Sequence, residues 1–182
     1  MAKALISIVY TYDFVGDDGK LTAGKPAQAI EDDIVRVTKE AYEAGDYIFF
    51  AIDAHDEGDD FHPEAKLFPP HNIKGTSGRD LYGKLADLYE TIQSDQRVFW
   101  MDKRHYSAFS GTDLDIRLRE RRVTTVGLTG VLTDICVLHT AIDAYNLGYD
   151  IEIPAAAVAS LTQENHQFAL NHFKNVLGAK II

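Results

Sequence analysis

The chain has 182 residues and a formal net charge of -10, with 46% hydrophobic and 25% charged residues. This length and balance suit one folded domain over residues 1–182, and they show no sign of disorder. The acidic charge argues against nucleic acid and anionic membranes as partners, and we find neither an apolar stretch long enough to span a bilayer nor an N-terminal targeting signal.

The first half of the chain alternates between strand and helix patterns. Residues 3–10 (KALISIVY) predict a strand, and residues 26–43 predict an amphipathic helix that Gly45 ends. Residues 47–53 (YIFFAID) predict a second, buried strand. A loop rich in His, Asp, Glu and Pro follows, over residues 54–76.

The second half continues the same alternation. The predicted elements, in order, are a helix at 79–93, a strand at 98–101, a helix at 113–122, a strand at 123–131, a helix from about 135, a strand at 149–153, a helix at 162–177 and an edge strand at 179–182. Such alternation predicts a three-layer α/β fold, with an open, mostly parallel sheet of about six strands and helices on both faces.

Three groups of reactive side chains follow predicted strands. They are Asp53 with His55, then Lys103, then Cys136. In an open parallel sheet, ligand sites lie outside the carboxyl ends of the strands, so we expect these groups to converge. Together they make up a cysteine nucleophile, a cation beside it and a set of metal-ligand types.

Cys136 is the only cysteine, which excludes an internal disulfide and favours a cytoplasmic location. It falls in the first turn of a helix that Thr133 or Asp134 can cap. Unpaired N–H groups and the helix dipole favour a thiolate there, and the same N–H groups can hold an oxyanion. The alternative is an ordinary buried cysteine in the core.

The long loop offers carboxylate and imidazole side chains. Asp53 and His55 lie two positions apart, so an extended backbone aims both the same way, and His62, Glu64 and His71 follow. These ligand types suit zinc, manganese or iron better than calcium. The alternative is a polar surface loop whose histidines bind nothing.

Taken together, these residues resemble the isochorismatase-like cysteine hydrolases, and most closely the nicotinamidase/pyrazinamidase branch. The resemblance covers nearly the whole chain. The motifs that carry it are Asp53-Ala54-His55, Phe68-Pro69-Pro70-His71 with Gly75-Thr76-Ser77-Gly78, Lys103 ahead of Tyr106-Ser107-Ala108-Phe109-Ser110-Gly111, and Gly130-Val131-Leu132-Thr133-Asp134-Ile135-Cys136-Val137.

The resemblance implies hydrolysis of nicotinamide, or of pyrazinamide-like amides, to the acid and ammonia in NAD salvage. Cys136 would form a thioester, and Lys103 would stabilise the thiolate or the developing negative charge. The backbone N–H groups of Leu132 and Cys136 would form the oxyanion hole, beside a cis peptide at Val131-Leu132.

The resemblance also implies one divalent metal ion, with zinc first and manganese or iron as alternatives. The ion would orient the pyridine ring of the substrate. Its implied ligands are Asp53, His55, His71 and Glu64. The implied ring-binding residues are Phe14, Phe68 and Tyr106, for which packing in the core is the alternative.

One position departs from the family pattern. Relatives carry an aspartate five residues before the phenylalanine that corresponds to Phe14, and it completes an Asp–Lys–Cys triad; here Val9 stands in its place. Valine cannot move the thiol proton to the leaving ammonia. Positioned acid–base groups contribute about 10²–10⁴-fold, so we expect slow turnover with binding retained.

Neighbouring carboxylates are poor substitutes for the triad aspartate. Asp13 holds its own family position, Asp53 is assigned to the metal, and Asp102 precedes Lys103 and can point away. Lys103 would then have only Cys136 to balance its charge. This predicts a persistent thiolate–ammonium pair and a thiol that alkylates readily.

Three functions therefore remain open. The chain is a working nicotinamidase, an impaired member that binds metal and nicotinamide, or an isochorismatase-like protein with another substrate or an interaction role. Asp53, His55 and His71 count against metal-free relatives. We expect a small amide as the substrate and, from the resemblance, a homo-oligomer.

Overall fold

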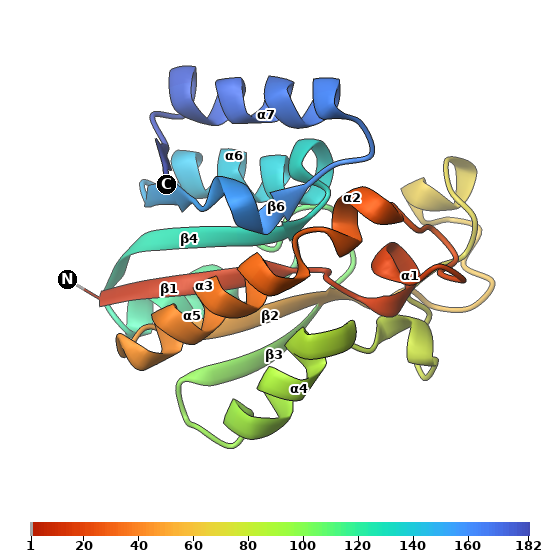
Figure 1. The fold of residues 1–182 in the computed structure, drawn as a ribbon, viewed down its shortest axis with the longest axis horizontal. Helices are drawn as coiled ribbons and strands as arrows, with labels where there is room; N and C mark the ends of the chain where they lie inside the picture. The colour runs from red at the N-terminus through yellow and green to blue at the C-terminus, as the bar shows by residue number, and fades with distance from the viewer. Residues whose placement is uncertain (1) are drawn as a thin grey trace.

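A computed structural model describes residues 2–182. One sheet runs through the molecule in the strand order β3-β2-β1-β4-β5-β7, with β6 paired to β4, and every strand pairing in it is parallel (Figure 1). The strands are β1 (Ala2–Ile8), β2 (Tyr47–Asp53), β3 (Val98–Lys103), β4 (Val123–Val131), β5 (Asp150–Ile153), β6 (Val158–Ala159) and β7 (Lys180–Ile181).

Helices cover both faces of this sheet. In Figure 1, α3 crosses in front of β1 and β2, whereas α5 lies behind them. The α-helices are α1 (Tyr12–Val15), α2 (Lys25–Gln28), α3 (Glu31–Glu43), α4 (Gly83–Ile92), α5 (Leu114–Glu120), α6 (Leu138–Asn146) and α7 (Gln163–Asn175). The three-layer α/β prediction is therefore confirmed. No helix within residues 2–182 is long and apolar enough to cross a membrane.

The central strands are apolar because they are covered on both sides. From Ala4 to Ile8 in β1, and from Ile48 to Asp53 in β2, every residue is buried. Continuous apolar runs of this kind are expected of parallel strands that have helices on each face. The core is thus built around β1 and its two neighbours, and it holds the ends of these strands in fixed register.

Several element boundaries differ from the sequence prediction. The predicted helix 26–43 is two helices, because Ile30 leaves the helical conformation and three acidic residues start α3, where the helix dipole favours carboxylates. The predicted helix 79–93 begins instead at Gly83, whose φ of 53° marks a turn. The sheet has seven strands, because the two-residue strand β6 gave no periodic signal.

Candidate active site

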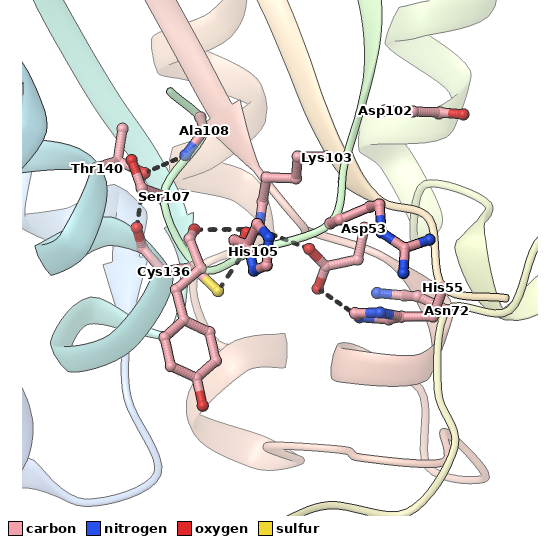
Figure 2. Close-up of polar contacts among 12 residues, drawn as sticks. Asp53, His55, Asn72, Asp102, Lys103, His105, Ser107, Ala108, Cys136 and Thr140 are labelled. Carbon is pink, nitrogen blue, oxygen red and sulfur yellow. Dashed lines mark hydrogen bonds and ion pairs between the residues drawn. The ribbon is translucent and has the colours of Figure 1, made fainter. Parts of the chain in front are cut away.

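The candidate site lies where four adjacent strands end. Strands β3, β2, β1 and β4 are neighbours in the sheet, and their carboxyl ends lead to Lys103, Asp53, Val9 and the turn that holds Cys136. Asp53 and Lys103 are paired directly in the register of β2 and β3. Figure 2 shows the side chains of Asp53, Lys103 and Cys136 gathered at this edge.

Cys136 lies in a π-helical turn, Thr133–Val137, that leads from β4 into α6. The predicted cis peptide at Val131-Leu132 is present. The predicted cap is wrong: Leu132 is the cap residue, and no side chain caps the turn. Thr133 bonds the His166 ring instead, and Asp134 accepts a hydrogen bond from Ser160.

Lys103 is the most completely buried charged residue at the site, with 1% of its surface exposed. Its ammonium donates hydrogen bonds to Asp53 Oδ1 at 2.5 Å and to the carbonyls of His105 at 2.7 Å and Tyr106 at 3.1 Å. The Cys136 Sγ lies 3.8 Å from the same Nζ (Figure 2). Burial opposes the charge of the ammonium, but its neighbours, Asp53 foremost, outweigh burial and raise the pKa of Lys103.

The predicted thiolate is not supported by this arrangement. Burial raises the pKa of the Cys136 thiol to about 12, and the nearby Lys103 only partly offsets this effect. Lys103 forms a buried ion pair with Asp53. The prediction that Cys136 alone would neutralise the lysine is therefore wrong. At neutral pH the thiol therefore keeps its proton and needs a base to remove it.

Val9 follows β1 and is fully buried. Its φ of 40° lies in the left-handed region, which a β-branched residue rarely adopts. Its amide donates to the Ala51 carbonyl at 3.0 Å, which ties the end of β1 to β2. The residue therefore occupies a structurally fixed place beside the site but offers no group that can carry a proton.

Asp13, which precedes Phe14, and Asp102, which precedes Lys103, are both engaged elsewhere. Asp13 accepts hydrogen bonds from the amides of Asn72 at 2.7 Å and Lys20 at 3.1 Å, so it joins the first loop to the loop that follows β2. Asp102 is exposed, pairs with Arg79 and points away from the cluster in Figure 2. Neither can replace the carboxylate that Val9 lacks.

Asp53, His55 and His71 form a buried group with metal-binding geometry. One ligand atom from each lies within 4.8 Å of the others. The Nε2 atoms of His55 and His71 are buried without a hydrogen-bond partner, which is costly for a polar group unless something else binds it. Nδ1 of His71 donates a hydrogen bond to the Pro69 carbonyl at 2.8 Å, which directs Nε2 of the same ring toward the group.

Glu64 lies beside this group, on the short helical turn Pro63–Lys66. Its Oε2 is 3.4 Å from His71 Nε2 and 3.8 Å from His55 Nε2. Burial lowers the pKa of His55, although Asp53 and Glu64 oppose this shift. Burial opposes the charged form of His71 too, but Glu64 and the Pro69 carbonyl outweigh it and raise the pKa of His71. Neutral imidazole is the form that binds metal, so a cation at His71 would displace a proton; the carboxylate and imidazole donors are the types that fit a divalent cation.

The three aromatic residues surround the site at different depths. Phe14 is buried, with its ring centroid 5.3 Å from that of His71, and Phe68 is half-buried at 6.3 Å from the same ring. Tyr106 is half-buried and packs 5.1 Å from His139. Two hollows adjoin them, one lined by Phe68 and His71 and the other by Tyr106, and both are lined by Glu64.

His62 is a member of the site that the sequence prediction left without a role. Its ring lies between those of His55, 4.8 Å away, and His105, 5.4 Å away. Its Nε2 contacts the Arg104 carbonyl at 2.7 Å, and its Nδ1 accepts from the Glu64 amide. The sequence feature that could have identified His62 is its position in the His-rich loop, two residues before Glu64. Only the structure shows that the His62 ring orients Glu64.

Comparison with known proteins places the chain in a family. The isochorismatase domain matches residues 3–182. The structure of a pyrazinamidase/nicotinamidase from Streptococcus mutans has 81% sequence identity and a TM-score of 0.98, with 100% of both chains covered. Nicotinamidase/pyrazinamidase PncA from Bacillus subtilis has 56% identity and a TM-score of 0.97, covering 100% of this chain and 99% of that one.

A more distant structure has bound metal. It is the pyrazinamidase of Pyrococcus horikoshii in complex with zinc, with 26% identity and a TM-score of 0.86, covering 100% of this chain and 99% of that one. These matches span the described fold from end to end. The chain therefore belongs to the isochorismatase family, in its nicotinamidase/pyrazinamidase branch.

Proposed function

We propose that this chain hydrolyses nicotinamide, and related pyridine or pyrazine carboxamides, to the acid and ammonia through a thioester on Cys136. One observation carries this proposal: the thiol lies 3.8 Å from a buried ammonium, at the strand edge that also holds the Asp53, His55 and His71 group. The names of the Streptococcus mutans and Bacillus subtilis structures support the same substrate class.

In the first half of the reaction, Cys136 Sγ forms a bond to the carboxamide carbon and the C–N bond breaks. Lys103 stabilises the developing negative charge from its fixed position. The backbone N–H groups of Leu132 and Cys136, on the turn after β4, are the proposed donors to the oxyanion. In the second half, water hydrolyses the thioester and releases the acid.

Asp53, His55 and His71 would hold one divalent ion, with Glu64 as a further ligand and zinc as the first candidate. The orphaned Nε2 atoms of both histidines and the zinc complex of the Pyrococcus relative support this assignment. When bound, the ion would supply a coordination position that orients the ring nitrogen of the substrate. Phe14, Phe68 and Tyr106 would form the walls around that ring.

Turnover should be slow, because the thiol proton has no carrier. The proton must leave Cys136 and reach the departing nitrogen, and neither Val9 nor the raised pKa of Cys136 assists this transfer. The same observation favours a second candidate function, in which the chain binds metal and nicotinamide without turning over. The product acid of an active chain would enter NAD salvage in the cytoplasm.

The test follows ammonia and nicotinate formed from nicotinamide by the zinc-loaded protein, by its Cys136→Ala variant and by protein treated with a chelator. We expect the zinc-loaded protein to form product slowly, and we expect no product from the Cys136→Ala variant or from the chelator-treated protein. Binding of nicotinamide by calorimetry, without product, would favour the second candidate. Product formation by Cys136→Ala at the rate of the unmodified chain would refute the proposed nucleophile.

A further inference from the structure

Asp53 lies between the Lys103 ammonium and the His55 imidazole. Its Oδ1 accepts a hydrogen bond from Lys103 Nζ at 2.5 Å, and its Oδ2 lies 3.9 Å from the orphaned Nε2 of His55. The pairing of Asp53 with Lys103 in the β2–β3 register fixes this geometry, because both residues end their strands side by side. One carboxylate thus stands between an ammonium and the candidate cation position.

Within residues 2–182, Asp53 is the only carboxylate that bonds Lys103. The other two hydrogen bonds of the ammonium go to the uncharged carbonyls of His105 and Tyr106. The family position for a second carboxylate holds Val9, and Asp13 and Asp102 are occupied elsewhere. The carboxylate that pairs directly with Lys103 therefore belongs to the proposed metal site.

We propose that Lys103 and the bound divalent ion compete for the negative charge of Asp53, so that this chain holds metal more weakly than it would if Lys103 had a carboxylate of its own. The inference rests on the proposed metal site. Lys103 and Asp53 are both nearly inaccessible to water, so charge repulsion between the two cations is poorly screened.

A purely positioning role for Lys103 predicts the opposite change in metal affinity. If Lys103 served mainly to hold Asp53 in the orientation that binds metal, its removal would weaken metal binding. If the two cations compete, its removal strengthens metal binding, because Asp53 keeps its full charge for the ion. The sign of one affinity change therefore decides between the roles, whether or not the protein turns over substrate.

The experiment measures Zn²⁺ affinity of the metal-free chain by competition with a chromophoric chelator at constant pH. Lys103→Met keeps the buried volume without the charge, and we expect about tenfold tighter binding or more. Val9→Asp gives Lys103 its own carboxylate, and we expect tighter binding as well. Lys84→Met, which removes an equal charge from an exposed pair with Asp32, is the matched control and should leave the affinity unchanged.

Circular dichroism and thermal unfolding establish that each variant is folded. Should Lys103→Met fail to fold, Val9→Asp still tests the proposal, because it adds the missing partner and leaves the ammonium in place. Zn²⁺ binding that is unchanged or weaker in the folded variants overturns the competition and leaves the metal site standing. No Zn²⁺ binding by the unmodified chain overturns the metal site itself, and the competition with it.

Discussion

Position 9 combines two constraints that valine satisfies poorly. The backbone there is left-handed, with φ at 40°, and the side chain is fully buried at the end of β1, between the ends of β2 and β4. Aspartate and asparagine tolerate this backbone region far better than β-branched residues do. The sequence alone revealed the missing carboxylate, but the strained backbone is visible only in the structure.

Two substitutions separate the effect of the missing carboxylate from the effect of the left-handed backbone. Val9→Asp should raise kcat for nicotinamide by about 10²–10⁴-fold, because it restores a proton carrier beside Cys136. Val9→Asn suits the left-handed backbone equally well but cannot carry the proton, so it should leave kcat low. Nicotinate formation under saturating substrate measures both; equal gains would mean that backbone relief, rather than proton transfer, limits the rate.

The thiol gives a second prediction at the scale of a single residue. Its pKa is raised to about 12, so the thiolate fraction is small at neutral pH and grows as pH rises toward that value. The rate of iodoacetamide labelling of the metal-free protein should increase about tenfold per pH unit from pH 7 to 9, without levelling off. Cys136→Ser provides the background, and a plateau near pH 7 would contradict the prediction.

At the scale of elements, α6 is tied to the loop after β3 through Thr140. This buried hydroxyl donates to the Cys136 carbonyl at 2.7 Å and accepts from the Ala108 amide at 3.0 Å (Figure 2). It thereby connects the turn that carries the nucleophile to the loop whose carbonyls bind Lys103. Nothing in the sequence indicated that Thr140, one helical turn after Cys136, makes this connection.

Removing this hydroxyl should loosen the connection. Thr140→Val keeps the shape but leaves the Ala108 amide buried and unpaired, so we expect a loss of about 1–3 kcal/mol in the free energy of unfolding. Thr140→Ser keeps the hydroxyl and should lose only about 0.8 kcal/mol, for one buried methyl group. Urea unfolding measures both variants, and equal losses would show that packing rather than the hydrogen bond matters.

The order of elements was predictable because strands buried on two faces produce long apolar runs, as in residues 47–53, whose predicted bounds match β2. Convergence of Asp53, Lys103 and Cys136 followed from the rule for strand ends. The π-helical turn at Cys136 and the Asp53–Lys103 pair were not predictable. The pair joins residues that lie 50 positions apart in the sequence, and the π-helical turn has no periodic signature of its own.

At the scale of the whole molecule, metal binding should stabilise the fold, because the ligands come from β2 and the loop after it and are assembled only in the native state. At a Zn²⁺ concentration about 100 times the dissociation constant, the gain is roughly 2.7 kcal/mol. For a chain of this size that corresponds to a rise in Tm of about 5–10 °C.

Thermal unfolding with and without Zn²⁺ measures this shift. His71→Ala should abolish it, because a ligand is lost, whereas His172→Ala on α7 should retain it. A shift that survives His71→Ala would place the stabilising ion elsewhere on the molecule.

Asp13, which joins the first loop to the amide of Asn72, also fills the space next to Gly78. A Cβ added at Gly78 would lie 2.1 Å from the Asp13 carboxylate, so a larger residue there would push this anchor aside. The neighbouring residue, Phe14, stands against His71. A residue larger than glycine at position 78 would thus displace the Asp13 carboxylate and, through the adjoining Phe14, disturb the packing against His71.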